Sequence, residues 1–247
     1  MGLPVIGLPK YETTLPSNGR VVTFRPFLVK EEKILLLAME AGDTKAQNRA
    51  LRDILVNCVY DDIKIDALPM FDIEYLFIQI RGKSVGEILE PIVSCPECKT
   101  TGKLKVRLDE IGVDMNKRKE TPYKIMVSDT IGMTLIYPSM NSVAGAGADK
   151  KGKEADSIVM FKVITKCIES IFDAENTYNP KEYSEKELND FIEGIPSESF
   201  KKVVEFISDI PRVEKNVHFK CPSCGCEKEF LLQGIEDFFD SASPTTA

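Results

Sequence analysis

Two short cysteine motifs constrain this chain of 247 residues more than any other feature of its sequence. Segments 95–98 and 221–224 both read C-P-x-C, so each places two thiols on one tight turn. Zinc binds four ligands in a tetrahedron, and thiolates are among the ligands that it prefers. We therefore predict one structural zinc ion per chain, and the sulfurs that hold it are those of Cys95, Cys98, Cys221 and Cys224.

The segments on either side of each motif are short and of strand character. A strand before and after each turn is the layout of a zinc ribbon, in which two hairpin knuckles face each other across one metal ion. The separation is unusual, because the 122 residues from 99 to 220 lie between the motifs. A metal ion held by both would close this long loop and so restrict the unfolded chain.

Two other residues bear on this site. Cys226 follows the second motif by two residues, and it is either a substitute for Cys224 as the fourth ligand or a spare thiol beside the site. His218 precedes the motif and competes as a ligand, although a single histidine on a strand is more often packed. Four thiolates would fill the coordination shell, which favours a structural over a catalytic metal. A redox dithiol is disfavoured, because neither motif lies in a strand–helix setting of the thioredoxin kind.

The rest of the pattern predicts an α+β fold. Asn18-Gly19 suits the tight turn of a hairpin over residues 10–29. Apolar spacing predicts helices over 30–40, from about 44 to 58 and from Pro69, where Cys58 belongs to a core face. Further strands are predicted over 88–93, 104–108, 123–127, 133–137 and 213–219. Further helices are predicted over 155–172, with Cys167 in the core, and from 196. Another helix is predicted to follow the capping box at 184–187.

We divide the chain accordingly. The divisions are an N-terminal arm and β-hairpin (1–29), a helical segment (30–86), a β-rich zinc-ribbon-like module (87–137 with 212–238), a flexible loop (138–156), a helical segment (157–211) and a disordered tail (239–247).

Composition excludes several functions. The net charge of -7 argues against a free-standing nucleic-acid binder. The chain has one histidine, which leaves little room for histidine-based catalysis. Residues 147–153 match most of a phosphate-binding loop, but Glu154 stands where serine or threonine should hold magnesium. The pairs Glu31-Glu32 and Asp61-Asp62 fit solvated surface charge, so we predict a protein that is not an enzyme.

Charge is unevenly distributed. Residues 168–247 carry a net charge of -9, which suits a solvated surface or a basic protein partner. Segment 99–124 is net +4 and lies beside a knuckle, so a zinc-ribbon nucleic-acid-associated module is the alternative function. We find no apolar run of 18 residues and no signal peptide, and we expect a cytosolic protein without a membrane span.

One stretch goes beyond generic patterns. Residues 15–19 and the run F-R-P-F-L-V-K-E-E-K over 24–33, before a leucine-rich helix, resemble the baseplate hub and hub-assembly proteins of T-even-like contractile-tailed bacteriophages. Residues 74–86 and 184–211 resemble the same family. The resemblance implies a role in tail assembly, as a hub subunit or an assembly factor for the hub and tape measure. It carries over no active site, and the zinc site depends on the spacing chemistry alone.

The resemblance also implies partners and a location. We expect other tail and baseplate hub proteins as partners, among them the tape-measure protein. The chain would work in the host cytoplasm during assembly or in the baseplate of the virion tail. Amphipathic helices after Ser184 offer a groove for a helical partner. The residues predicted to line it are Leu188, Phe191, Ile192, Phe200, Val203, Val204 and Ile207.

Overall fold

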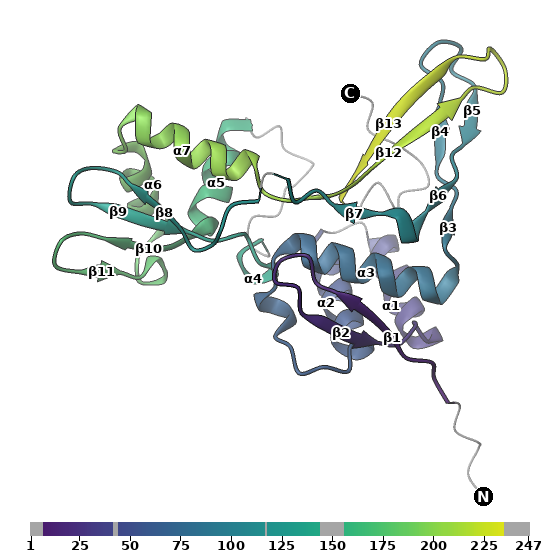
Figure 1. The fold of residues 1–247 in the computed structure, drawn as a ribbon, viewed down its shortest axis with the longest axis horizontal. Coiled ribbons are helices and arrows are strands. Elements are labelled where there is room, and N and C mark those ends of the chain that lie inside the picture. The colour runs from purple at the N-terminus through teal and green to yellow at the C-terminus, as the bar shows by residue number, and fades with distance from the viewer. Residues whose placement is uncertain (1–6, 42–43, 117, 144–155, 235–247) are drawn as a thin grey trace, which may run out of the picture. The chain divides into compact units, whose positions relative to one another are not determined.

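The computed structural model describes residues 7–41, 44–116, 118–143 and 156–234. Helices and small antiparallel sheets alternate along the chain, which confirms the predicted α+β class (Figure 1). The chain forms two compact units. The first combines residues up to 65, 71–115 and the part from 212 on, and the second combines 66–70 with 116–211.

The first unit begins with the predicted hairpin. Strands β1 (Tyr11–Thr14) and β2 (Val21–Phe24) pair in antiparallel register, with Tyr11 opposite Phe24. Gly19 at the turn adopts a positive φ of 72°, which a residue without a side chain reaches at no steric cost. The Asn18 side chain accepts a hydrogen bond from the backbone N–H of Arg20 at 2.9 Å and closes the turn.

Three helices follow the hairpin: α1 (Val29–Ala41), α2 (Thr44–Cys58) and α3 (Met70–Val85), with a 3₁₀ turn η1 (Ile65–Ala67) before the last. The third helix begins directly after Pro69 and ends before Gly86, whose φ is 129°. The hairpin and these helices bury a shared apolar core, which includes Leu15, Val22, Phe24, Ile54, Leu55, Ile73, Leu76 and Phe77. Residues 42–43, expected to end one helix and cap the next, lie outside the described residues.

The expectation that Glu31 is a solvated surface charge is wrong, because its carboxylate is fully buried. Arg25 donates two hydrogen bonds to it, at 2.9 and 3.3 Å, and the backbone N–H of Leu28 donates a third at 2.9 Å. Both charged residues come from the F-R-P-F-L-V-K-E-E-K run that carries the resemblance. The run therefore contains a buried ion pair that links the end of β2 to the first turn of α1.

The knuckle module of the first unit contains seven short strands: β3 (Ile88–Leu89), β4 (Ile92–Ser94), β5 (Thr101–Lys103), β6 (Val106–Arg107), β7 (Gly112–Val113), β12 (Val213–Lys220) and β13 (Glu227–Gln233), with a 3₁₀ turn η2 (Leu108–Glu110). The single strand predicted over 88–93 is interrupted, and the strand predicted over 104–108 is shortened to Val106–Arg107. Pro91 has no N–H to donate, so the ladder breaks there. Its carbonyl still accepts a hydrogen bond from Leu104 at 2.9 Å.

An apolar cluster joins this module to the third helix. Ile78 from α3 belongs to the same buried cluster as Leu108 of η2 and Phe219 of β12. Gly82 allows a close approach, because a Cβ at this position would lie 3.6 Å from the Cβ of Leu108. The strands that carry the cysteine motifs therefore have an apolar core of their own beneath them.

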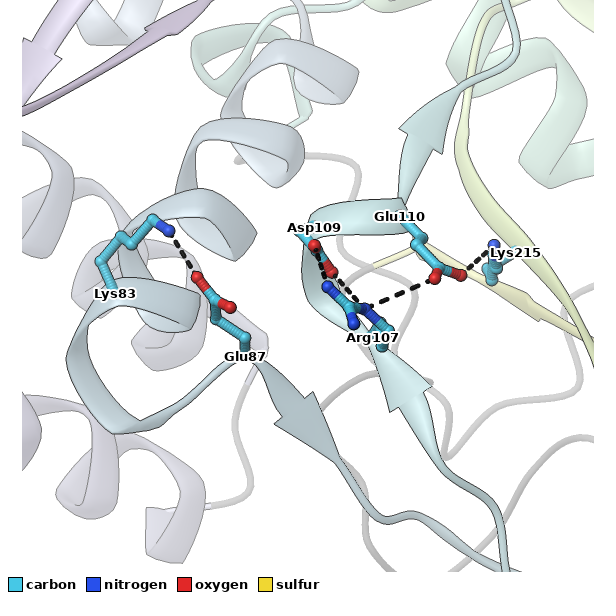
Figure 2. A network of polar contacts seen from close by, with 6 residues as sticks. All are labelled: Lys83, Glu87, Arg107, Asp109, Glu110 and Lys215. Carbon is cyan, nitrogen blue, oxygen red and sulfur yellow. Dashed lines mark hydrogen bonds and ion pairs between the residues drawn. The ribbon is translucent and has the colours of Figure 1, made fainter.

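A surface network of charges borders that cluster (Figure 2). Lys83 pairs with Glu87 at 2.5 Å, and Arg107 pairs with Asp109 at 2.6 Å. Lys215 of β12 forms an ion pair with Glu110, with 3.0 Å between Lys215 Nζ and Glu110 Oε2. Exposed pairs of this kind contribute little energy each, so the apolar cluster dominates the packing here.

The second unit has one antiparallel sheet in the order β11-β10-β9-β8. Its strands are β8 (Tyr123–Met126), β9 (Gly132–Leu135), β10 (Ile168–Phe172) and β11 (Thr177–Tyr178), and its helices are α4 (Met140–Val143), α5 (Asp156–Cys167), α6 (Glu185–Glu193) and α7 (Ser197–Ser208), with a 3₁₀ turn η3 (Pro180–Glu182). Phe206 of α7 stacks on Tyr123 and Tyr137, with ring centroids 5.5 and 5.4 Å apart.

Several expectations for this region are wrong. The helix predicted over 155–172 ends at Cys167, and Ile168–Phe172 is a strand that pairs with β9. Residues 123–137 were grouped with the knuckles, whereas β8 and β9 pair with β10 in the second unit. The loop expected over 138–156 contains the short helix α4, and its residues 144–155 lie outside the described part.

The capping box expected at 184–187 is confirmed. Ser184 and Glu187 form the capping box, in which each side chain accepts a hydrogen bond from the other residue's backbone N–H. Among the described residues, no helix is both long and apolar enough to cross a membrane. The tail over 239–247 lies outside the described residues.

Candidate metal centre

The structure brings together the four cysteines of the two C-P-x-C motifs. The sulfur atoms of Cys95, Cys98, Cys221 and Cys224 all lie within 4.8 Å of one another. Across the two motifs, Cys95 Sγ lies 3.6 Å from Cys224 Sγ, and Cys98 Sγ lies 3.5 Å from Cys221 Sγ. A cluster of four sulfurs this close is a donor set that fits one tetrahedral metal ion.

Strand pairing positions the two motifs. The first turn connects β4 to β5, and the second connects β12 to β13. Both hairpins reach the same end of the module (Figure 1). In each turn the first cysteine is buried and the second is exposed. The cluster thus has one side against the apolar core and one side toward solvent.

The two turns share one backbone pattern, which we describe by numbering each turn from its first cysteine. The N–H of the first residue donates to the carbonyl of the sixth, at 2.9 Å from Cys95 to Thr100 and 2.8 Å from Cys221 to Cys226. The N–H of the fifth residue donates back to the first cysteine, at 3.0 and 3.1 Å. The two knuckles therefore repeat the same local backbone structure.

Donors of the first turn point at its sulfurs. The Thr100 hydroxyl and backbone N–H donate to Cys98 Sγ, and these bonds lower the pKa of the Cys98 thiol to about 6. The backbone N–H groups of Cys98 and Glu97 likewise lower the pKa of Cys95. Hydrogen bonds of this kind favour the thiolate, which is the form that binds a metal ion.

The second turn differs in its thiol at the exposed position. The backbone N–H of Cys226 acts to lower the pKa of Cys224, but the neighbouring thiol of Cys98, burial and the thiols of Cys221 and Cys95 together raise it to about 12. A group of four adjacent thiols cannot all ionise at neutral pH without a cation. A bound divalent cation would remove this conflict, so the cluster is suited to a metal ion.

The fifth position of each turn is in the left-handed region. Gly225 has a φ of 72°, and Lys99 has a φ of 60° although it carries a side chain. A non-glycine residue in this region costs on the order of 1 kcal/mol. In the second turn, the glycine that ends the run C-P-S-C-G is the sequence signal for this conformation. The first turn has lysine at the same position, which gives no such signal.

This asymmetry makes a prediction. We expect Lys99→Gly to raise the free energy of unfolding by about 0.5–1 kcal/mol, because glycine adopts the observed φ without strain. Gly225→Ala should lower it by a similar amount for the converse reason. Urea denaturation of the metal-loaded protein measures both. A loss of stability in Lys99→Gly would contradict the argument.

The two hairpins also fit closely beside the sulfurs. Gly102 of β5 lies beneath the ring of Phe219, and a Cβ at this glycine would approach Phe219 Cε2 to 2.7 Å and Pro222 Cδ to 3.5 Å. Phe219 is buried and packs edge-on to Phe230 at a centroid distance of 5.6 Å. Apolar packing therefore stabilises the contact between the hairpins beside the four sulfurs.

The other candidate ligands lie outside the cluster. The cluster of four sulfurs does not include Cys226. The imidazole of His218 is 58% exposed and lies 3.6 Å from a Glu227 carboxylate oxygen, so it is not packed, and the four-residue cluster does not include it. Cys58 and Cys167 are fully buried on helix faces, as predicted, and burial raises the pKa of each thiol, to about 11 and about 12.

The residues predicted to form a partner groove have two kinds of environment. Leu188, Ile192 and Val203 are buried inside the second unit and belong to its core. The side chains that remain partly exposed are Phe191, Phe200, Val204 and Ile207. Phe200 stacks on Phe161 of α5 at a centroid distance of 5.8 Å.

The basic segment 99–124 is partly neutralised by local acidic residues. Lys103 pairs with Glu90 at 3.4 Å, and Arg107 pairs with Asp109 at 2.6 Å. In the second unit, Lys119 lies within 3.2 Å of a Glu205 carboxylate oxygen. These cations are engaged with carboxylates, which weakens the case for a phosphate-binding surface.

These features describe a protein in which four cysteines, from two hairpins that are distant in sequence, lie together beside an apolar core. Comparison with known proteins gives its class. A family described as T4 bacteriophage base plate protein matches residues 8–240, so the chain belongs to this bacteriophage baseplate family. The resemblance deduced from the motifs is confirmed, and the protein has a role in the phage tail baseplate.

The chain is also similar to one individual baseplate protein. The chain is 20% identical over 231 residues to the baseplate hub assembly protein gp26 of Enterobacteria phage T4. The alignment covers 94% of this chain and 98% of that protein. No solved structure matches the chain.

Proposed function

We propose that this protein is a non-enzymatic assembly factor for the hub of a phage tail baseplate, acting through contacts with other tail proteins. The observation that carries the proposal is the match of residues 8–240 to a baseplate family, together with the similarity to a protein that is named a hub assembly protein. Assembly takes place in the host cytoplasm before the tail is complete. The hub and tape-measure proteins of the same phage are the partners to test.

A structural zinc ion at Cys95, Cys98, Cys221 and Cys224 is part of this proposal. The support is the donor set, because four thiolates in one cluster favour zinc over harder cations. Four protein ligands would leave no open position for a substrate. The ion would bind and hold the two hairpins, and no chemical step on a substrate is assigned to it.

The partner surface proposed here is the partly exposed apolar face of α6 and α7. The exposed part of this face is formed by Phe191, Phe200, Val204 and Ile207. The other residues predicted to line the groove, Leu188, Ile192 and Val203, are buried in the core of the second unit. A helical segment of a tail protein would place its own apolar residues on such a face. The acidic charge of residues 168–247 favours a partner segment with basic flanks.

A pull-down after co-expression tests this surface. We expect Phe200→Glu to abolish capture of the tape-measure or hub protein, because a charge on the apolar face must be desolvated on binding. Lys201→Glu is the matched control, since Lys201 is an exposed neighbour on the same helix. Circular dichroism checks the fold of both variants. If folded Phe200→Glu captures its partner as the wild type does, this surface is not the binding site.

A further inference from the structure

Helix α1 carries an apolar run that the core of its own unit covers on one side only. Residues 34–37 read I-L-L-L, and four successive residues of an α-helix spread over most of its circumference. Glu31 and Ala38 are buried, so they mark the side of α1 that faces the core. The other side of the helix keeps large apolar side chains in solvent.

The exposed side of α1 is a continuous strip, which we call the α1 strip and which consists of Val29, Lys33, Leu36, Leu37 and Glu40. Each member lies three or four residues from another member, and residues at this spacing are neighbours on a helix surface. Val29 is 81% exposed, and the two leucines are 55% and 56% exposed. Single exposed apolar residues are ordinary, whereas a contiguous set of them marks a contact surface.

The charges at the two ends of the leucine pair make the α1 strip complementary to itself. Lys33 and Glu40 are two helical turns apart, about 10 Å along the axis, and the leucines lie halfway between them. If two α1 helices run antiparallel about a two-fold axis between Leu36 and Leu37, Lys33 of each copy lies level with Glu40 of the other. Four leucines then meet at the centre, between two symmetry-related ion pairs. A two-fold contact requires a self-complementary surface of this kind.

We propose that the α1 strip is an interface between two copies of this chain, which pair through antiparallel α1 helices. A parallel pair would place lysine beside lysine and glutamate beside glutamate, so the charges select the antiparallel arrangement. A contact along one helix of 13 residues is smaller than a standard protein interface. We therefore expect a reversible dimer, present at about 100 µM chain and dissociated at about 1 µM. This interface depends on neither the zinc ion nor the tail-protein partners proposed above.

Sedimentation velocity of the full chain over this concentration range, in a reducing buffer, tests the proposal. Lys33→Glu and Glu40→Lys each turn both attractive pairs into repulsive ones, so each should raise the dissociation constant of the dimer about tenfold or more. The double variant Lys33→Glu/Glu40→Lys exchanges the charges and should dimerise as the wild type does. Glu32→Lys is the matched control for Glu40→Lys, because Glu32 is exposed on the same helix outside the strip.

The result that supports the interface is a dimer that both single variants weaken and the double variant restores, while Glu32→Lys leaves it unchanged. A wild-type chain that stays monomeric at the highest concentration would overturn the proposal. So would a dimer that the single variants do not weaken or the double variant does not restore. A monomeric wild type that captures a tail protein, with capture lost in Leu36→Glu/Leu37→Glu, would assign the strip to another protein instead. Circular dichroism checks that every variant is folded.

Discussion

Replacing Cys95 by serine is expected to abolish tight zinc binding and to destabilise the first unit by about 4 kcal/mol in the presence of zinc. A ligand that binds only the folded state stabilises it by about 4 kcal/mol when its free concentration is a thousand times its dissociation constant. Cys95 is fully buried among the cluster sulfurs, so no nearby water-exposed group replaces it. The same ion would close a loop of 122 residues and so restrict the unfolded chain.

Urea denaturation with and without a chelator measures this effect. The wild-type midpoint should fall when the chelator is added, whereas the midpoint of Cys95→Ser should be low in both conditions. Cys226→Ser is the matched control, since it changes the same residue type beside the cluster without removing a cluster sulfur. If the wild-type and Cys95→Ser midpoints coincide in zinc, the ion has no structural role.

The second large effect concerns the buried ion pair near the N-terminus. Glu31→Gln is expected to destabilise the protein by about 3–5 kcal/mol, because it leaves the Arg25 guanidinium buried without its counter-charge. The side chain of Arg25 is 7% exposed and that of Glu31 is fully buried, so water does not compensate. Chemical denaturation at neutral pH measures the loss.

A double variant is the control for this effect. Replacing Arg25 by Met and Glu31 by Leu removes both charges, and such replacements are often neutral or stabilising. The double variant should therefore be more stable than Glu31→Gln alone. A cost below about 1 kcal/mol for Glu31→Gln would show that the pair is solvated and that the description of this site is wrong.

The same pair predicts how stability depends on pH. Burial alone would raise the pKa of Glu31, but the hydrogen bonds from Arg25 and from the Leu28 backbone lower it below its usual value. A lowered folded-state pKa gives stability that is present above the unfolded pKa and lost as the pH falls through the folded one. The wild type should therefore lose stability in acid more steeply than Glu31→Gln does.

Local sequence rules predicted the elements whose signal lies in a few adjacent residues. The hairpin turn at Asn18-Gly19, the start of α3 after Pro69 and the capping box at Ser184 all depend on one turn of chain. The metal-ligand candidates were predictable for the same reason, because two C-P-x-C motifs specify ligand type and spacing together. The structure then brings their sulfurs together across 122 intervening residues.

Elements that depend on distant partners were predicted less well. Ile168–Phe172 continues the apolar pattern of α5, and it becomes a strand because β9 offers a partner for its backbone. The charge of Glu31 has no sequence signal that distinguishes it from its solvated neighbour Glu32, since only the position of Arg25 makes it a buried ion pair. The left-handed Lys99 was missed because its type gives no indication of a positive φ.

The central claim is that one zinc ion joins the two knuckles of this baseplate protein. Metal analysis of the purified full-length chain, combined with its mass under native conditions, tests the claim most directly. We predict one zinc ion per chain, and no tightly bound zinc in a variant with serine at Cys95, Cys98, Cys221 and Cys224. A wild-type protein that purifies with far less than one zinc ion per chain, and does not take up zinc when it is added, would contradict the account.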